Sequence, residues 1–532
     1  MTRLQAVILA ADLNAEQQAF IDNAIRGAKG NLIVLEGLPS TGKIKKLAIL
    51  IVVLLVLGFK IVATAHSNDG VNEVYAKVHA LIQQHRLAGL EQVCIRLHGP
   101  GKEDQLSNEL EFGIKRVHSG CLAKRIHDFT TRQPRSSAME EYCAHLKARF
   151  FSGPGAGKPK DCKMDFETAR TVVRAQVVSN MRFIAATTFV ASKLAEEKMP
   201  FQADVEILDE AAQAPEPDAV STIVAQEKLQ LLVLCGDTEQ LGPVVLSHQG
   251  QGNPLSGLLI KSLMTRLTAA QPHITTHRLK VNYRSHEKLI KMPSKLFYND
   301  EMVAAQIRPP SRVAENIKEA LRDRNVFGAI YLNKINQDNR QFFFNVDGEA
   351  VTEPHGSSSS NPAGRAAIVP FVEHLVVTAQ VPQGEIGIIS MYTDDVSRMR
   401  NELAEIQLQD VEVATVDSFQ GREKTVMIVH FVAAFPRRHN PFGFVHNSNR
   451  LCVATTRAKE FQFLFGYFAF WEQKLEEMQR RVTRAVGPGA KRVAAEANKE
   501  YDSQGKLRGM MEFMKEHDLG VDWDGVRLPT GR

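Results

Sequence analysis

The sequence predicts an α/β protein with two tandem domains, each built on a parallel sheet, and a helical insertion in the first domain. Three observations support this fold class. Short apolar segments alternate with helix-like segments over the first 240 residues, and a second set of such segments begins at about residue 275. A glycine-rich string of the phosphate-binding type follows the first apolar segment. A chain of 532 residues is also too long for one hydrophobic core.

Apolar segments in the first half are predicted to form strands. Each is short and ends in a small, polar or acidic residue, which is typical of a parallel sheet that is buried on both faces and carries its chemistry at the strand ends. The segments are residues 31–37, 59–65, 182–188, 205–210 and 231–237. The apolar run at 43–57 fits a helix or a further strand, and we interpret it as a buried helix.

The string GLPSTGKI at residues 37–44 follows the first predicted strand. It contains the pattern G-x-x-x-x-G-K, in which backbone N–H groups and a helix N-terminus face a phosphate. The predicted nucleotide-binding loop consists of Gly37, Pro39, Ser40, Thr41, Gly42, Lys43 and Ile44. A chance match is expected about 0.1 to 0.2 times in a chain of this length. The interpretation as a phosphate-binding loop therefore depends on the strand and helix that flank the string. The similar string at 152–160 lacks such a strand, and we expect a loop there.

Ile44 departs from the phosphate-binding pattern, because a Ser or Thr hydroxyl normally occupies this position and ligates Mg²⁺. Ser40 and Thr41 lie inside the loop and are not obvious substitutes. Water can fill the vacant ligand position, but the Ile44 side chain would crowd it. Because a lost metal-shell contact costs roughly 10 to 100-fold in metal affinity or activity, we predict a working but weakened nucleotide site.

Cysteine usage and hydropathy indicate the compartment. Six cysteines are scattered without a C-x-x-C pair, which argues against a disulfide framework and against a zinc site and favours a reducing environment. The first residues turn polar too soon for a signal peptide. The uninterrupted apolar run at 47–57 has 11 residues, and a membrane span needs about 20. These features predict an intracellular protein, cytoplasmic or nuclear, that has no membrane partner.

Residues 98–175 interrupt the strand pattern with mixed charged, helix-like segments. They contain 14 Lys and Arg against 10 Asp and Glu, together with four His. A basic insertion fits a polyanionic partner, and a solvated face explains the composition equally well. The predicted division is a first domain at 1–97 and 176–272, the insertion at 98–175, a second domain at 273–470 and a charged helical tail at 471–532.

The second half contains its own set of apolar segments. Strands are predicted at residues 328–333, 385–390, 411–416, 425–432 and 461–466. Residues 355–364, which are rich in Ser and Gly, are expected to form a flexible loop. A charged helix is expected from Trp471 onward.

Acidic and amide side chains follow two of the first-half strands. After one strand, Asp209 can hold Mg²⁺, and the adjacent Glu210 can orient or deprotonate an attacking water. Alone, such a pair more often caps the next helix, but a phosphate-binding loop in the same predicted sheet favours catalysis. After another strand, Asp237 and Gln240 would lie beside the phosphate site, where Gln240 can contact a γ-phosphate.

The strings GLPSTGK, DEAAQ and GDTEQLGP, in this order, resemble motifs I, II and III of superfamily 1 helicases. More specifically, they are similar to those of the up-frameshift-like (1B) branch, the RNA helicases of nonsense-mediated mRNA decay and their relatives. Further strings match the same family in order: LNAEQ, ATAHSNDGVNEV, AATTFVA, LKVNYRSHEKL, VATVDSFQGREKTVMIV and NRLCVATTRAKEFQFLFG. The matches run from residue 13 to about residue 470 and so cover both halves of the chain.

The resemblance implies two RecA-like domains with ATP and Mg²⁺ between them. The implied nucleotide contacts are Gln17 and Tyr283 at the base, Glu423 at the ribose, Lys43 at the β- and γ-phosphates, Asp209 at Mg²⁺, Glu210 at the attacking water, and Gln240, Arg284 and Arg457 at the γ-phosphate. The implied single-strand contacts are Ser67, Asn68, Thr187 and Thr415. Met391 and Asp395 depart from the family, which usually has Pro and Gln at these positions.

The implied function is that of a monomeric, ATP-dependent helicase that moves 5′ to 3′ along single-stranded RNA or DNA, with hydrolysis reduced by Ile44. A second hypothesis is an ATP-gated clamp that holds a single strand and hydrolyses too slowly to unwind. Ile44 and the missing accessory modules before residue 13 favour the clamp. The helicase is favoured by the catalytic residues that are intact, which are Asp209, Glu210, Gln240, Arg284 and Arg457. The sequence does not distinguish RNA from DNA.

Overall fold

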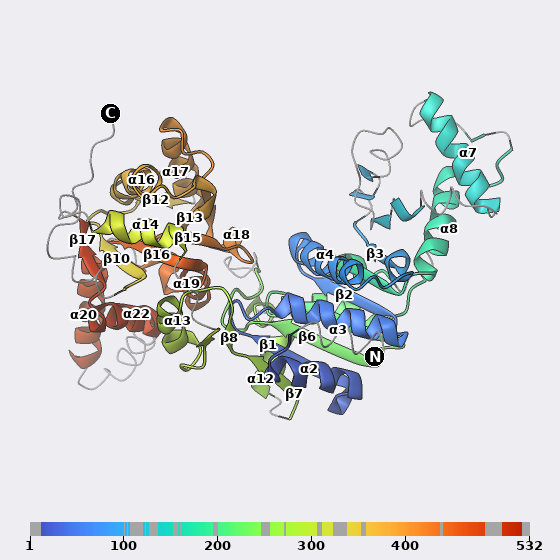
Figure 1. Cartoon of the computed structure of the whole chain (residues 1–532), viewed down its shortest axis with the longest axis horizontal. Coiled ribbons are helices and arrows are strands. Elements are labelled where there is room, and N and C mark those ends of the chain that lie inside the picture. Colours follow the sequence, from blue (N-terminus) through green and yellow to red (C-terminus); the bar gives the residue numbers. More distant parts are fainter. Residues whose placement is uncertain are drawn as a thin grey trace. The chain divides into compact units, whose positions relative to one another are not determined.

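The computed structural model describes residues 12–99, 102–103, 105–106, 121–122, 124–126, 137–152, 158–159, 161–194, 200–245, 256–270, 273–305, 311–322, 338–352, 358–436, 440–484 and 503–523. The chain divides into two compact units (Figure 1). The first unit comprises Met1–Gly37, Gly42–Thr238 and Gly242–Leu279, and the second comprises Leu38–Thr41, Glu239–Leu241 and Lys280–Arg532. Each unit has its own parallel sheet, so the predicted class of two tandem RecA-like α/β domains is confirmed.

The first unit is built on a sheet whose described strands are all parallel. Their order is β3 (Cys94–Arg96), β4 (Phe183–Thr187), β2 (Ile61–Ala65), β5 (Val205–Asp209), β6 (Leu231–Gly236), β1 (Leu32–Gly37) and β7 (Thr275–Leu279). All the strands predicted in this half form. The sequence pattern does not predict β3, which is very short, or β7, whose sequence TTHRL has no apolar run. Because β7 pairs with β1, the first sheet extends beyond the predicted boundary at residue 272.

Helices cover both faces of the first sheet. One face packs against α2 (Ala15–Arg26), α3 (Lys43–Leu57) and α4 (Asn68–Gln84), and the other against α8 (Phe166–Ser179), α9 (Thr188–Ala191), α10 (Glu216–Val224) and α12 (Leu263–Ala270). Side chains alternate along β1, where Ile33 and Leu35 join the core beneath α3 and Val34 joins the core on the opposite face. The run at 43–57 is the helix α3, and it is buried because it lies between α2, α4 and the sheet. No helix among the described residues is long and apolar enough to cross a membrane.

The predicted insertion at 98–175 is described only in part. It contains α7 (Ser137–Ser152), which packs against α8, and Figure 1 shows both in teal. Since α8 continues to Ser179, the predicted end of the insertion falls inside this helix. The side chains of Val173 and Val177 pack with Ile184 of β4. Most of the loop expected at 152–160 lies outside the described residues.

The second unit contains another sheet of parallel strands. The described order is β14 (Glu412–Thr415), β13 (Ile386–Ser390), β15 (Lys424–His430), β16 (Ala458–Gly466), β10 (Gln341–Asn345) and β17 (Gly520–Asp522). The predictions at 385–390, 411–416, 425–432 and 461–466 correspond to β13, β14, β15 and β16, and the segment at 328–333 lies outside the described residues. β17 pairs with β10, so the chain beyond residue 471 contributes a strand to this sheet as well as helices.

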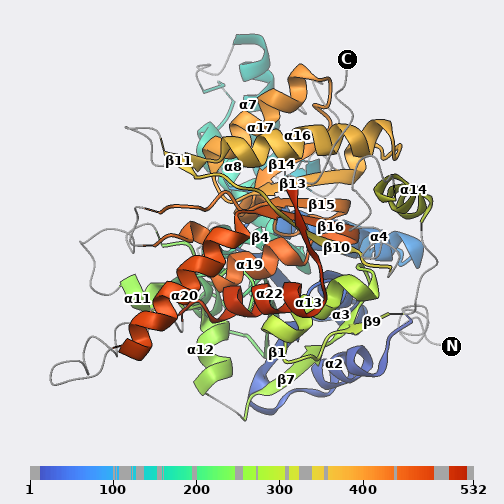
Figure 2. The same cartoon turned by 90° about the vertical axis from the view of Figure 1, so that its left-hand side faces the viewer.

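Helices also cover both faces of the second sheet. Figure 2 shows α16 (Pro362–Val377) and α17 (Thr393–Glu405) on one side and α19 (Ser448–Thr455), α20 (Phe468–Arg484) and α22 (Gly505–Glu516) on the other. The remaining α-helices and strands that the structure describes here are α13 (Glu287–Phe297), α14 (Arg312–Leu321), α18 (Val416–Phe419) and the short pairs β8 (Val281–Asn282) with β9 (Val303–Ala304) and β11 (Val351–Thr352) with β12 (Ser359–Ser360). The expectation of a flexible loop at 355–364 is therefore wrong for its described part, which contains β12 and the start of α16.

Candidate nucleotide and nucleic-acid sites

The strands of the first unit end at one edge, and most of the predicted functional residues of this unit lie there. Ala65 of β2 is in register with Thr187 of β4 on one side and with Asp209 of β5 on the other. Gly37 ends β1 next to β6. Because parallel strands share one carboxyl edge, the phosphate-binding loop, the acidic pair and the predicted strand contacts are gathered at the same edge.

The phosphate-binding loop connects β1 to α3. Gly42 is the N-cap of α3 and has a φ of 77°, in the left-handed region that favours glycine. The Lys43 Nζ donates a hydrogen bond to the Gly37 carbonyl oxygen at 2.6 Å, across the loop. The Thr41 hydroxyl donates to the Leu38 carbonyl oxygen at 2.9 Å. The loop thus places Lys43 and the free N–H groups of a 15-residue helix at the edge of the sheet.

Two residues of this segment, Ser40 and Ile44, have unusual features. Ser40 has a φ of 64°, and its Oγ is buried without a hydrogen-bond partner. A left-handed conformation costs a non-glycine residue roughly 1–2 kcal/mol. Ile44 is half-buried and packs against the core around α3. Its side chain provides no oxygen for a cation.

Asp209 has the surroundings of a cation ligand. It ends β5 at 1% exposure, and neither of its carboxylate oxygens has a hydrogen-bond partner. Burial and then the charge of Glu210 raise the pKa of Asp209 above its usual range. A buried carboxylate without partners is costly unless a cation neutralises it. The residues present therefore fit Mg²⁺, which typically takes one or two protein carboxylates and completes its shell with water and phosphate oxygens.

Glu210 is held in an unusual backbone conformation. Its φ of 50° lies in the left-handed region, and strained conformations of this kind gather at functional sites. Its Oε2 accepts a hydrogen bond from Gln213 Nε2 at 3.0 Å. Gln213 is not among the predicted site residues, although its place as the last residue of DEAAQ could have indicated it. We conclude that Gln213 orients the Glu210 carboxylate.

Gln17 lies at the start of α2 in a reciprocal cap. The Gln17 N–H donates to Asn14 Oδ1 at 3.0 Å, and the Asn14 N–H donates to Gln17 Oε1 at 3.2 Å. Gln17 is 1% exposed, and its Nε2 has no hydrogen-bond partner. This buried amide donor fits an acceptor on a ligand, such as a ring nitrogen of adenine.

The predicted single-strand contacts also have structural roles. Ser67 is the N-cap of α4, and its Oγ accepts from an N–H in the first turn at 3.1 Å. Asn68 Oδ1 accepts from Nη2 of the buried Arg96 at 2.8 Å. Thr415 is the N-cap of α18 in the second unit, where its Oγ1 accepts a backbone N–H. Thr187, in contrast, is the N-cap of α9 and makes no side-chain capping bond.

The predicted arginines of the second unit each pair with another predicted nucleotide residue. Arg284 forms an ion pair with Glu423, which also lies 3.3 Å from the ammonium of Lys459. Burial alone would raise the pKa of Glu423, but the charges of Arg284 and Lys459 hold it below its usual range. Arg457 is 3% exposed, and its Nη2 donates to Gln240 Oε1 at 2.6 Å. Each guanidinium group is therefore oriented by another side chain. The family resemblance implies that both members of each pair contact the same nucleotide.

Tyr283 stands beside a pocket of the second unit. Its N–H donates to the Ser40 carbonyl oxygen at 2.9 Å, and its side chain is 39% exposed. The pocket has a volume of about 130 Å³, and its lining includes Tyr283, Arg284, His286 and Lys459. An aromatic ring next to cationic groups is a suitable surface for a base and its sugar.

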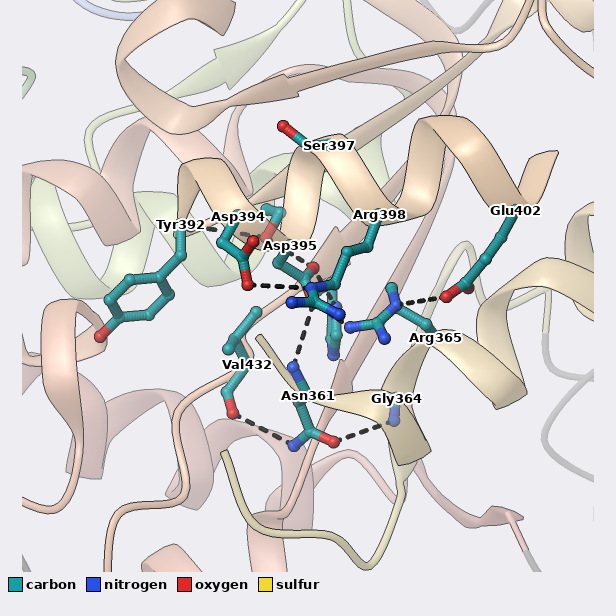
Figure 3. A network of polar contacts seen from close by, with 12 residues as sticks. Asn361, Gly364, Arg365, Tyr392, Asp394, Asp395, Ser397, Arg398, Glu402 and Val432 are labelled. Carbon is teal, nitrogen blue, oxygen red and sulfur yellow. Dashed lines mark hydrogen bonds and ion pairs between the residues drawn. The ribbon is translucent and has the colours of Figure 1, made fainter. Parts of the chain in front are cut away.

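Asp395, where the family usually has Gln, lies in a buried polar network of the second unit (Figure 3). Its carboxylate accepts from the Asn361 N–H at 3.1 Å, the Arg365 Nη1 at 3.1 Å and the Ser390 Oγ at 2.8 Å, and it lies 2.7 Å from His430 Nδ1. Burial alone would raise the pKa of Asp395, but His430 and these hydrogen bonds hold it below its usual range. The network joins α16, β13, α17 and β15, so this departure from the family has a structural role.

Comparisons with known proteins agree with this arrangement of motifs. Two family models, each described as an AAA domain, match residues 156–248 and 259–468, which together make up more than half of the chain. An uncharacterized ATP-dependent helicase of Methanocaldococcus jannaschii is 30% identical over 294 residues, which cover 55% of this chain and 40% of that protein. The regulator of nonsense transcripts 1 homolog of Neurospora crassa is 27% identical over 455 residues, which cover 84% of this chain and 36% of that protein.

A third relative matches along most of both chains. The DNA polymerase alpha-associated DNA helicase A of Saccharomyces cerevisiae is 27% identical over 504 residues, which cover 88% of this chain and 68% of that protein. By contrast, this chain spans less than half the length of the two relatives from Methanocaldococcus jannaschii and Neurospora crassa. On the order of its motifs, the two family-model matches and these relatives, the chain belongs to the up-frameshift-like (1B) branch of superfamily 1 helicases.

Proposed function

We propose that this protein hydrolyses ATP and uses the energy to move 5′ to 3′ along single-stranded RNA or DNA as a helicase. The observation that carries the proposal is the edge of the first sheet. There, Asp209, whose buried carboxylate has no hydrogen-bond partner, ends β5 beside β2, and Lys43 and the N-terminus of α3 supply the cradle for phosphates. One relative is named as a regulator of nonsense transcripts and another as a DNA helicase, which supports either polymer, and the direction comes from the family resemblance.

Each proposed role uses the chemistry of a residue of this chain. Lys43 and the α3 N-terminus bind the phosphates, and Asp209 holds Mg²⁺, which would neutralise charge on the phosphate oxygens. Glu210, oriented by Gln213, positions the attacking water and takes its proton. Arg284 and Arg457 stabilise the charge that develops on the γ-phosphate.

The alternative is an ATP-gated clamp that binds a strand and turns over slowly. It is favoured by the phosphate-binding loop, in which Ile44 supplies no metal ligand. A helicase should hydrolyse ATP faster when single-stranded RNA or DNA is added. A clamp should instead release its strand more slowly with ATP, with turnover that stays at the basal rate.

The decisive experiment measures nucleotide affinity and turnover separately, with RNA and with DNA. Glu210→Gln should lower turnover by roughly 10²–10⁴-fold, because the side chain keeps its size and loses its basicity, while ATP still binds. Lys43→Ala should instead weaken ATP binding itself. Glu227→Gln is the matched control, because this exposed carboxylate precedes β6 and so lies away from the carboxyl edge of the sheet, and it should change neither quantity. Near-parental turnover in Glu210→Gln would refute the assignment of the acidic pair.

A further inference from the structure

Phe189 exposes most of its ring at the edge of the first sheet. Its exposure is 66%, although Thr188 and Val190 on either side are buried. A single exposed apolar residue is common on protein surfaces, so exposure alone indicates no function. The position of Phe189 at the sheet edge and the cation beside its ring together indicate a function.

Phe189 follows the end of a strand next to the predicted single-strand contacts. β4 ends at Thr187, which is in register with Ala65 at the end of β2. Ser67 lies two residues after Ala65, and Phe189 likewise lies two residues after Thr187. In addition, α9, which contains Phe189, packs against β2. The ring thus projects from the same part of the edge as Ser67 and Thr187.

A cation accompanies the exposed ring. The Lys193 Nζ lies 4.6 Å from the centroid of the Phe189 ring, and both side chains are exposed. Between them, Val190 and Ala191 pack into the core, which anchors the short helix that carries the ring. An exposed aromatic ring with an adjacent ammonium matches the two parts of a nucleotide, because the base stacks on the ring and the phosphate pairs with the cation.

We propose that Phe189 is a base-stacking residue of the single-strand site and that Lys193 contacts a neighbouring phosphate. The inference rests on the proposed function, and it adds a stacking contact to the polar contacts expected of Ser67, Asn68 and Thr187. Stacking on an aromatic ring tolerates every base, because each base has a π-face. The contact therefore contributes affinity without sequence selectivity, for RNA and for DNA.

The test measures the affinity of the full chain for oligouridine and oligothymidine over a range of salt concentrations. Phe189→Ala should weaken binding by roughly 5 to 150-fold, which is the worth of one base–aromatic stack, with an unchanged salt slope. Phe189→Leu, which keeps apolar bulk without a ring, should lose a similar amount, and Phe189→Trp should bind as tightly as the parent. Lys193→Met should lower the slope of log affinity against log salt by roughly 0.7.

The control variant is Val224→Ala, which removes an apolar side chain of 72% exposure from α10 and should bind like the parent. If the parent binds the strands and Phe189→Ala binds as tightly, the stacking proposal is overturned and the helicase proposal stands. If Phe189→Leu binds like the parent, apolar contact rather than stacking operates, and the proposal is also overturned. If the parent binds neither oligonucleotide, the proposed function itself fails.

Discussion

At the scale of single residues, Ile44 limits the nucleotide site. The position lacks the hydroxyl that usually ligates Mg²⁺, and the side chain packs into the first-unit core. We expect Ile44→Thr to raise ATP turnover by roughly the 10 to 100-fold that a metal-shell contact is worth. The gain should shrink as Mg²⁺ is raised, because excess metal compensates for weak binding. Ile44→Val, which shortens the side chain without adding an oxygen, is the control. Equal turnover in all three proteins at low Mg²⁺ would contradict the prediction.

Ser40 offers a second test in the same loop. Its φ of 64° and its buried, partnerless hydroxyl both cost free energy. Ser40→Gly should increase the free energy of unfolding by about 1 kcal/mol, because the relief of roughly 1–2 kcal/mol of backbone strain exceeds the chain entropy that a glycine adds to the unfolded state. Ser40→Ala removes the hydroxyl and keeps the strain, so it separates the two costs. Thermal unfolding of the three proteins provides the measurement, and a Ser40→Gly variant no more stable than Ser40→Ala would show that the conformation carries little strain.

At the scale of elements, the contact between β5 and α10 contains a buried acid. Glu206 on β5 has no exposure and accepts a hydrogen bond from the Thr222 hydroxyl on α10. Burial raises the pKa of Glu206 to about 7, although the Thr222 hydrogen bond opposes the shift. The folded protein therefore keeps a proton that the unfolded chain releases above pH of about 4.3. Stability should consequently fall as the pH rises from about 4.3 to 7.

Glu206→Gln should remove this loss, because an amide keeps the hydrogen bond and does not ionise. The variant should match the parent near pH 4.5 and exceed it by roughly 3 kcal/mol at pH 8. The measurement is the unfolding temperature of both proteins across this range. Glu227→Gln, at an exposed site, should follow the parent at every pH. A constant difference between Glu206→Gln and the parent would exclude titration of this group as the cause.

At the scale of the whole molecule, each unit has its own sheet and its own apolar cores. A destabilising substitution in the second unit should therefore lower the stability of that unit and leave the stability of the first unit unchanged. Asp395→Asn leaves Arg365 and His430 without their shared carboxylate, and the loss of one partner from a buried charge network costs about 3 kcal/mol or more. Because the pKa of Asp395 is lowered, its contribution persists above pH of about 4 and fades only in stronger acid.

Hydrogen exchange resolved by peptide is the measurement for this network. Peptides from β13, β15 and α16 should exchange faster in Asp395→Asn at neutral pH, and peptides from β1, β2 and β5 should keep their parental rates. Asp394→Asn changes the adjacent carboxylate, which is partly exposed and pairs with Arg398, and should leave both sets unchanged. Faster exchange in both sets for Asp395→Asn would show that the units do not unfold separately.

The sequence by itself determined the fold class, most of the strands and the family. Strands buried on both faces need continuous apolar runs, and a phosphate-binding loop needs glycines at fixed spacing, so both are visible along the chain. Only the tertiary structure decided that β7 and β17 complete the two sheets, because short or polar strands have no apolar run and form through their neighbours. It also decided the pairing of Arg457 with Gln240 and the network around Asp395, since these contacts join residues far apart in sequence. The exposure of Phe189 likewise depends on which residues pack around it in the folded chain, and the local sequence pattern does not predict this.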